Sequence, residues 1–384
     1  MTERIPVFKP HIGVETLKAA VDALDMGWLG MGSYVGEFEA RLAEYLELRG
    51  RHVVAVNTGT SALHLAMLVA GVQPGDEVLT PSFNNIGDFQ AIKAAQAEPV
   101  FCDVDERTLG IDVEKAERLI GPRTRAIIGM DYDGIPCALD ELEQMAARHG
   151  LVVIHDAAHS LGSRLKGRSM GNFGDISVFS FDPVKLITCI DGGALVVDSE
   201  ETVAQLQRYR LLGMDQSAKR MYTNNRAWTY DVPGQGFRYH LANLHAAIGL
   251  TQLAKIDEFI ISRRRACRHY NAVLSGVDGL VVPQTDFDDV APFLYYIRVL
   301  DGHRDALIDQ LKAEGIDTGI HWIPGHRFSF LKEARRGDLS VTDRIGSEIL
   351  TLPLHSYMDL DVVDRVATAV RSLVAGLRRK ATAA

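Results

Sequence analysis

Lys185 is the residue of this sequence whose surroundings most clearly predict chemistry. Apolar residues 176–179 precede it and apolar residues 194–197 follow it, and both runs predict buried strands. A lysine held between buried strands loses hydration, which disfavours its charged form, and a neutral amine can form a Schiff base with an aldehyde. Ser180, shortly before it in the chain, could bind a phosphate. Pyridoxal phosphate (PLP) carries both an aldehyde and a phosphate, so the segment predicts a PLP site. The alternative is a Lys185 that is simply exposed on a turn.

Residues 57–61, with the sequence Asn-Thr-Gly-Thr-Ser, connect a predicted strand to a predicted helix. Gly59 permits a tight turn, and free N–H groups at a helix N-terminus bind phosphate with help from the helix dipole. The alternative is an ordinary helix N-cap at Thr60 or Ser61. No Gly-Lys-Ser/Thr sequence follows, so the segment is not a Walker loop.

Asp156 follows an apolar strand predicted at residues 151–154. Ligands of open parallel sheets bind beyond the carboxyl ends of strands, so Asp156 is placed where a cofactor would lie. A carboxylate there can keep the pyridine nitrogen of PLP protonated, which makes the ring an electron sink. His155 and His159 would point to different faces, and no third ligand has a suitable spacing. We therefore expect no metal site.

The elements that position these residues alternate between strand and helix, which predicts βαβ units and a mostly parallel sheet covered on both faces. Predicted strands lie at residues 53–56, 77–80, 99–102, 126–128, 151–154, 176–179 and 194–197, with helices at 61–71, 85–95, 113–120 and 139–149.

The two ends of the chain have different patterns. Helices are predicted at residues 14–24, 35–48 and 203–211, followed by a long loop at 213–239, one long helix at 244–270, a strand at 296–300 and helices at 304–314 and 362–378. We divide the chain into residues 1–250, an N-terminal arm with a large PLP-binding domain, and residues 251–384, a long helix with a small C-terminal α/β domain.

Composition excludes several classes of protein. The 384 residues carry a net charge of −9, which argues against binding to nucleic acid or to acidic membrane surfaces. The chain has no run of apolar residues long enough for a transmembrane helix, and its N-terminus lacks the apolar core of a signal peptide, so we expect a cytoplasmic protein. The four widely spaced cysteines are expected to be reduced thiols.

Six segments, in this order and over nearly the full length, resemble the DegT/DnrJ family of PLP-dependent nucleotide-sugar aminotransferases. They are residues 57–63, 74–83, 156–159, 180–193, 246–253 and 352–355. The resemblance implies the aspartate-aminotransferase-like fold (fold type I): a mostly parallel central sheet and a smaller C-terminal α/β domain. It also implies a homodimer with shared active sites.

The resemblance implies a role for each matched residue. Lys185 would hold PLP and move the proton between the substrate carbon and the cofactor carbon. Asp156 would bind the ring nitrogen, and His159 would lie against the ring or near its hydroxyl. Related sugar dehydratases carry a histidine in place of the lysine, so Lys185 favours transamination over deoxygenation.

The phosphate of PLP would be bound by Ser180 and by the turn at the start of the following helix. That turn is formed by Gly59, Thr60 and Ser61.

Two residues differ from the family pattern. Asn85 occupies the place where an aromatic residue often stacks on the cofactor ring, so either another residue stacks or the ring is held differently. Arg238 replaces an asparagine that in the family reaches the phosphate in the neighbouring subunit. Arginine binds phosphate well and could keep that role, or it could pair with a carboxylate of its own chain.

The function that the resemblance implies is transfer of an amino group, with glutamate as donor, to a nucleotide-linked keto sugar in deoxyaminosugar and antibiotic biosynthesis. A TDP-linked 4-keto-6-deoxy sugar aminated at C4 is the expected substrate. Amination at C3, a PLP-dependent sugar dehydratase or lyase, and a non-catalytic regulatory protein are the alternatives. Candidate substrate-binding residues are Trp28, Tyr230, His321 and Trp322.

Overall fold

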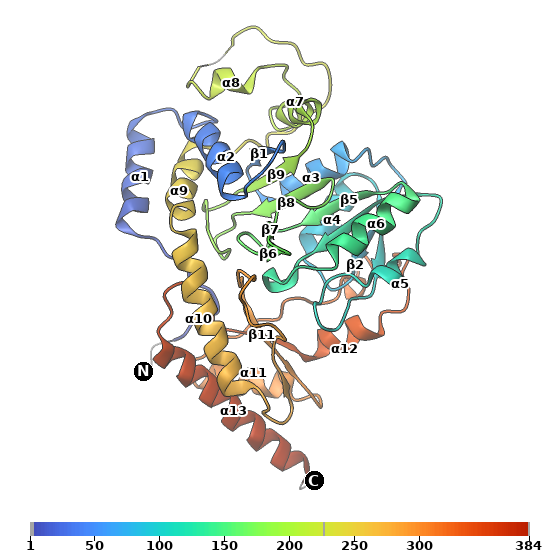
Figure 1. The fold of residues 1–384 in the computed structure, drawn as a ribbon, viewed down its shortest axis with the longest axis vertical. Helices are drawn as coiled ribbons and strands as arrows, with labels where there is room; N and C mark the ends of the chain where they lie inside the picture. Colours follow the sequence, from blue (N-terminus) through green and yellow to red (C-terminus); the bar gives the residue numbers. More distant parts are fainter. Residues whose placement is uncertain (1–3, 226, 383–384) are drawn as a thin grey trace.

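A seven-stranded sheet forms the centre of the computed structural model, which describes residues 4–225 and 227–382 (Figure 1). In spatial order the strands are β1 (His52–Val56), β9 (Gly193–Val197), β8 (Ile176–Ser180), β5 (Val152–Asp156), β4 (Thr124–Met130), β2 (Glu77–Pro81) and β3 (Glu98–Cys102). Strand β9 is antiparallel to both of its neighbours, and the other neighbouring pairs are parallel. The predicted mostly parallel sheet is therefore confirmed.

Helices cover both faces of this sheet because its strands are apolar on both sides. In β1, Val54 and Val56 pack toward one helical layer, whereas Val53 and Ala55 pack toward the other, as the two-residue period of a strand requires. The first layer contains α3 (Gly59–Val69), α4 (Ile86–Ala94) and α7 (Glu200–Tyr209). The second contains α2 (Ser33–Tyr45), α5 (Val113–Glu117), α6 (Leu139–His149) and α9 (Asn243–Leu253).

A second, smaller core lies below the sheet in Figure 1. It is built on an antiparallel three-stranded sheet in the order β10 (Leu280–Val281), β11 (Tyr295–Val299) and β12 (Ile349–Leu352). The helices of this part are α10 (Ile256–Leu274), α11 (Arg304–Ala313), α12 (Ser340–Glu348) and α13 (Leu360–Thr382). Shorter elements elsewhere are a hairpin of β6 (Arg164–Leu165) and β7 (Arg168–Ser169), α8 (Ala218–Met221), and two 3₁₀ turns at Tyr132–Gly134 and Gly325–Arg327.

The single long helix predicted at residues 244–270 is wrong, because the structure contains two helices there. Helix α9 ends at Leu253 and α10 begins at Ile256, and Lys255 between them has a non-helical backbone with φ −109° and ψ 4°. Helix α9 packs on α1 (Val14–Asp25) and α2, whereas α10 packs on α13. The break lets each helix follow its own core, and the apolar spacing continues across it, so periodicity alone could not reveal it.

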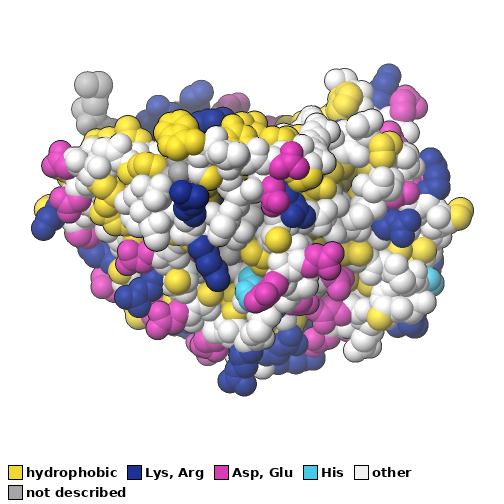
Figure 2. Space-filling model, turned by 90° about the horizontal axis from the view of Figure 1, so that it is seen from above, with side chains coloured by type: hydrophobic (Ala, Val, Ile, Leu, Met, Phe, Trp, Pro, Cys, Tyr) yellow, Lys and Arg dark blue, Asp and Glu magenta, His cyan; other side chains and the backbone are white. Residues whose placement is uncertain are grey.

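Helix α1 presents an apolar face to the surface. Val14 is 80% exposed, and Leu17, Val21 and Leu24 on the same side are each more than half exposed. The 213–239 loop adds Trp228, which is 91% exposed. Figure 2, which looks onto the α8 end of the molecule, shows hydrophobic side chains gathered along one edge of this face. Among the described residues, no helix is long and apolar enough to cross a membrane.

Candidate active site

A cavity of about 650 Å³ lies at the carboxyl edge of the central sheet, where β1, β5 and β8 end. The N-terminal ends of α3 and α4 form part of its wall, and residues 293 and 321–322 close it from the C-terminal part. Ligand sites of open α/β sheets lie at this edge, and the volume is typical of a small-molecule pocket.

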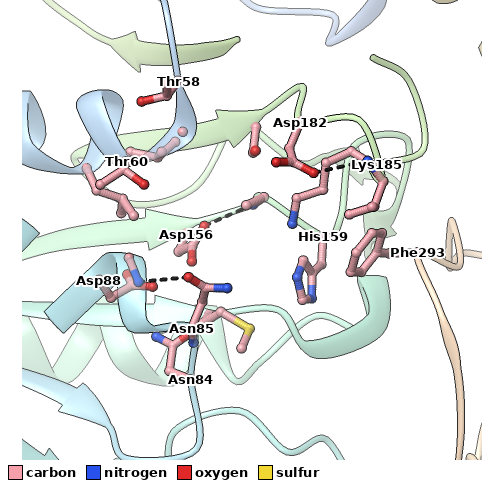
Figure 3. A pocket seen from close by; sticks show the side chains of 18 of the residues that line it. Thr58, Thr60, Asn84, Asn85, Asp88, Asp156, His159, Asp182, Lys185 and Phe293 are labelled. Carbon is pink, nitrogen blue, oxygen red and sulfur yellow. Dashed lines mark hydrogen bonds between the residues drawn. The ribbon is translucent and has the colours of Figure 1, made fainter. Parts of the chain in front are cut away.

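Lys185 points into this cavity from the connection between β8 and β9 (Figure 3). Its backbone N–H donates to the Asp182 carbonyl at 3.0 Å, so the residue does lie on a turn, but its side chain is partly buried. The amine Nζ lies 4.3 Å from the centre of the Phe293 ring. Burial lowers the pKa of Lys185 to about 8, against the opposing effect of Asp156 and other carboxylates. Its neutral form is therefore populated near physiological pH.

The first turn of α3 and the end of β8 form a cradle for an anion. Thr58 is the N-cap, since its side chain accepts from the Ser61 N–H at 2.9 Å, so the alternative cap at Thr60 or Ser61 is wrong. The N–H groups of a helix's first turn have no intrahelical acceptors, and Gly59 and Thr60 line the cavity. A Cβ on Gly59 would lie 2.8 Å from the Cβ of Ser180, so only glycine lets the two segments approach. Ser61 does not line the cavity, because its hydroxyl is turned toward Asn57 at 2.7 Å.

Two carboxyl groups, those of Asp156 and Asp88, form another part of the cavity wall (Figure 3). Asp156 ends β5, is 3% exposed, and accepts the Ala158 N–H at 3.0 Å. Burial raises the pKa of Asp156, while the Ala158 N–H and Lys185 act in the opposite direction. His155 is turned away from the cavity, and its Nε2 lies 2.7 Å from Oδ2 of Asp131.

Asp88 was missed by sequence reasoning. It lies in the first turn of α4, where an acidic residue is ordinary because it complements the helix dipole. Only the spatial closeness of α4 to the end of β5 reveals that the side chain belongs to the cavity.

Aromatic rings form the remaining wall. The His159 ring packs on Phe293 with centroids 4.2 Å apart, and it lies 5.8 Å from Trp322. Burial, together with Lys185, holds the pKa of His159 well below its usual range, so this imidazole is neutral. His321 also lines the cavity, and burial lowers its pKa to about 4. Phe293 was not predicted from the sequence, because nothing in its local pattern connects it to Lys185.

Asn85, predicted at the stacking position, caps α4 in this structure. Its Oδ1 accepts the Gly87 N–H at 2.7 Å, although the residue still lines the cavity. Because its amide oxygen caps the helix, the Asn85 side chain is held at the start of α4. The neighbouring Asn84 has a buried Nδ2 without a hydrogen-bond partner among the described residues.

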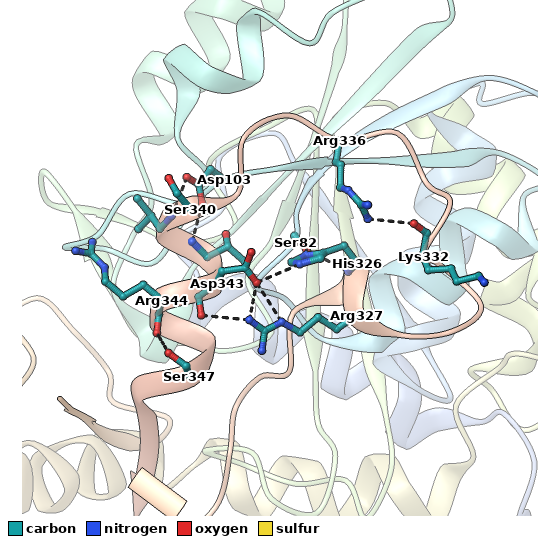
Figure 4. A network of polar contacts seen from close by, with 12 residues as sticks. Ser82, Asp103, His326, Arg327, Lys332, Arg336, Ser340, Asp343, Arg344 and Ser347 are labelled. Atoms are coloured by element: carbon teal, nitrogen blue, oxygen red, sulfur yellow. Dashed lines mark hydrogen bonds and ion pairs between the residues drawn. The ribbon is translucent and has the colours of Figure 1, made fainter. Parts of the chain in front are cut away.

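A polar chain fixes the segment that leads to Asn85 (Figure 4). Nδ1 of His326 lies 2.8 Å from the Ser82 hydroxyl, and Nε2 lies 3.2 Å from Oδ1 of Asp343, which also pairs with Arg327 at 2.6 Å. A serine, a histidine and an aspartate in this order could form a hydrolytic triad, but Ser82 is fully buried and does not line the cavity. The chain instead ties the C-terminal part to the wall of the site.

Besides Ser61, three further predicted residues do not line the cavity of their own chain: Trp28, Tyr230 and Arg238. Trp28 donates from Nε1 to the Met31 carbonyl at 2.8 Å, Tyr230 is half exposed, and Arg238 is exposed. The described lining residues include one lysine and no arginine, but four aspartates: Asp88, Asp156, Asp182 and Asp191. A single chain therefore offers little positive charge to an anionic ligand.

These residues fit PLP. The α3 cradle suits its phosphate, Lys185 suits its aldehyde, and the buried Asp156 suits its ring nitrogen. Nδ1 of His159 is buried without a hydrogen-bond partner among the described residues, so it has capacity for a ligand atom. Fold and site together define a PLP-dependent enzyme with the aspartate-aminotransferase fold.

Comparison with known proteins refines this class. The chain belongs to the DegT/DnrJ/EryC1/StrS aminotransferase family, which it matches over residues 10–371. It is 34% identical over 381 residues to the spore coat polysaccharide biosynthesis protein SpsC of Bacillus subtilis (strain 168), covering 97% of each chain.

Two solved structures are also similar. DesV of S. venezuelae, in complex with a ketimine intermediate, has 32% identity and a TM-score of 0.88, with 97% of this chain and 99% of that chain covered. DesI, solved in the presence of its TDP-sugar product, has 30% identity and a TM-score of 0.88, with 100% of this chain and 96% of that chain covered. The protein is a PLP-dependent sugar aminotransferase.

Proposed function

We propose that this enzyme transfers the amino group of L-glutamate to C4 of a TDP-linked 4-keto-6-deoxy sugar. The observation that carries the proposal is Lys185, with its lowered pKa, directed into a cavity that also holds Asp156. The TDP-sugar product of DesI supports the choice of nucleotide, and the family supports a keto sugar and an amino donor.

Each of the cavity residues named below has a distinct task in this proposal. Bound PLP supplies the electron sink that makes the carbon next to the amino nitrogen acidic. With PLP bound, Nζ of Lys185 would take the proton from that substrate carbon and deliver it to the former aldehyde carbon of the cofactor within the same half-reaction. In the second half-reaction it would move a proton in the opposite direction. Asp156 keeps a proton on the ring nitrogen, and Ser180 with Thr60 holds the phosphate. Phe293 and His159 exclude water around Nζ.

An amine-transfer assay over a panel of TDP- and UDP-linked keto sugars tests the substrate. We expect TDP-4-keto-6-deoxyglucose with L-glutamate to give the highest kcat/KM, about tenfold or more above the UDP-linked sugar, the size of discrimination that a few pocket contacts provide. Nuclear magnetic resonance of the product should place nitrogen at C4. A product aminated at C3, or a deoxygenated sugar without nitrogen, would instead support the alternative activities.

We also propose a homodimer whose active sites are shared. The exposed apolar face of α1, formed by Val14, Leu17, Val21 and Leu24, is a surface that a second copy would cover. Arg238 is exposed on the 213–239 loop and forms no ion pair with a described residue. The acidic lining of each cavity needs a cation, and Arg238 of the other subunit would supply it to the phosphate.

A mixing experiment tests the shared site. Lys185→Ala and Arg238→Ala chains are each expected to be nearly inactive alone. Random reassociation should restore about a quarter of the wild-type activity, because half of the dimers are mixed and each has one complete site. As a control, Lys185→Ala chains mixed with Lys185→Ala/Arg238→Ala chains should recover none. If the first mixture stays inactive, or Arg238→Ala keeps full PLP affinity, the cross-subunit role of Arg238 fails even if the protein is a dimer.

The division of the chain into residues 1–250 and 251–384 remains a proposal. The packing of α9 on α1 and α2, and of α10 on α13, supports a boundary close to the break between the two helices. A cytoplasmic location and a role in deoxysugar or antibiotic biosynthesis also remain proposals, which rest on the expected nucleotide-sugar substrate.

A further inference from the structure

We propose that Asp88 is a positioning residue for the ring nitrogen site: its carboxyl group carries a proton and donates a hydrogen bond to the Asp156 carboxylate. This inference rests on the PLP dependence of the enzyme and not on the identity of its sugar or amino donor. It assigns a function to a buried acid that the reaction described above does not use.

The first observation is the isolation of Asp88 from other protein donors. Its side chain is 0% exposed and lines the cavity from the first turn of α4. Neither carboxyl oxygen has a hydrogen-bond partner among the described residues. An ionised carboxylate in such a place loses its hydration without compensation, whereas a protonated one needs only a single acceptor.

The second observation is the neighbour that can be this acceptor. The side chains of Asp88 and Asp156 project from α4 and β5 into the same region of the cavity (Figure 3). Two buried carboxyl groups this close cannot both ionise cheaply, so one of them keeps a proton. The pKa of Asp88 is raised well above its usual range by burial and then by the charge of Asp156.

The charges around the pair decide which acid keeps the proton. Asp156 accepts the Ala158 N–H and is favoured in its charged form by Lys185 and His155. The charged form of Asp88 is favoured by its own backbone N–H and by Lys185, but both effects on its pKa are smaller than those of burial and of Asp156. The negative charge therefore belongs to Asp156 and the proton to Asp88.

The consequence concerns the proton on the ring nitrogen of PLP. A hydrogen bond that Asp88 donates to the Asp156 carboxylate stabilises the ionised form of Asp156. It therefore lowers the affinity of Asp156 for a proton. The proton shared between Asp156 and the ring nitrogen is thereby kept on the nitrogen. The pair presents one negative charge to one pyridinium, instead of two.

Infrared spectroscopy of the apoenzyme at neutral pH tests the protonation directly. The difference spectrum of wild type minus Asp88→Asn should contain the carbonyl-stretch band of a protonated carboxylic acid. Glu141→Gln is the matched control, because Glu141 is an exposed acid in the first turn of α6 and lies outside the cavity. Its difference spectrum should lack that band. If the Asp88→Asn difference spectrum shows only ionised carboxylate bands, the proposal is overturned.

Cofactor affinity tests the hydrogen bond, with the dissociation constant of PLP read from absorbance in the absence of sugar and donor. Asp88→Asn keeps a donor of the same shape, and its affinity should stay within about threefold of wild type. Asp88→Leu has no donor, and its affinity should fall about tenfold or more, as expected for one lost hydrogen bond to a charged group. Equal losses in both variants, or no loss in Asp88→Leu, would overturn the proposal. If Asp88→Leu does not fold, the infrared result decides alone.

Discussion

We expect Lys185→Ala to abolish amine transfer while the protein keeps its fold. The alanine removes the only lysine among the described residues that line the cavity, and with it the group that moves the proton. General acid–base catalysis by one positioned side chain contributes about 10²–10⁴-fold, and covalent attachment of the cofactor is lost as well, so kcat should fall at least about 10⁴-fold. Turnover under saturating PLP and thermal unfolding measure the two parts of this expectation.

Lys332→Ala is the matched control for that variant, because Lys332 is exposed and, among the described residues, its side chain forms an ion pair only with the neighbouring Glu333, at 3.8 Å. It should turn over at the wild-type rate. A Lys185→Ala enzyme that did the same would contradict the central assignment of the site.

The lowered pKa of Lys185 predicts how PLP uptake by the apoenzyme depends on pH. A pKa lowered from 10.5 to about 8 means that the neutral amine is populated from about pH 8 upward. The rate at which apoenzyme takes up PLP should therefore rise with pH, with a midpoint near 8. A midpoint near 10.5 would mean that burial does not act on Lys185 in this way.

Asp156→Asn has the second largest expected effect. The amide is neutral, so it no longer stabilises a proton on the ring nitrogen, and the electron sink weakens. Loss of one preorganised electrostatic partner lowers kcat about 10²–10³-fold. Because the cofactor ring also becomes a weaker electron sink, the fall in kcat of Asp156→Asn should reach or exceed the upper end of this range. The measurement is kcat with bound PLP verified by absorbance.

Asp140→Asn provides the comparison for Asp156→Asn, since Asp140 lies in the first turn of α6 and forms an ion pair with Lys166 outside the cavity. Its kcat should be unchanged. If Asp156→Asn turned over almost normally with PLP bound, the ring nitrogen would have another partner.

Much of the fold was predictable because each strand of the central sheet is a short, largely apolar segment between turn residues. Gly59, Asp156, Ser180 and Lys185 were predictable as a group for a related reason. All four follow or border strands, and the carboxyl ends of parallel strands meet at one edge. Their closeness therefore follows from topology, without knowledge of side-chain packing.

Other features depend on contacts that no local pattern contains. Asp88 and Phe293 reach the cavity only through the packing of α4 and of the C-terminal part. The helix break at Lys255 arises because α9 and α10 pack against different parts of the structure. The observed cap of α3, Thr58, lies two or three residues before the predicted caps. If Arg238 and Tyr230 contribute to the active site of the neighbouring subunit, the structure of a single chain cannot show their position in that site.

In the proposed shared site, the acidic lining of the cavity would make cofactor content depend on protein concentration. If Arg238 of the neighbouring subunit holds the phosphate, PLP binding and subunit association are thermodynamically linked. Linkage is reciprocal: the factor by which dimer formation tightens PLP binding equals the factor by which PLP tightens the dimer. Dilution would then release cofactor and subunits together, and added PLP would protect the quaternary structure by mass action. If the site is shared, four buried or half-buried aspartates around the one lysine among the described lining residues would join the cofactor and the assembly in one equilibrium.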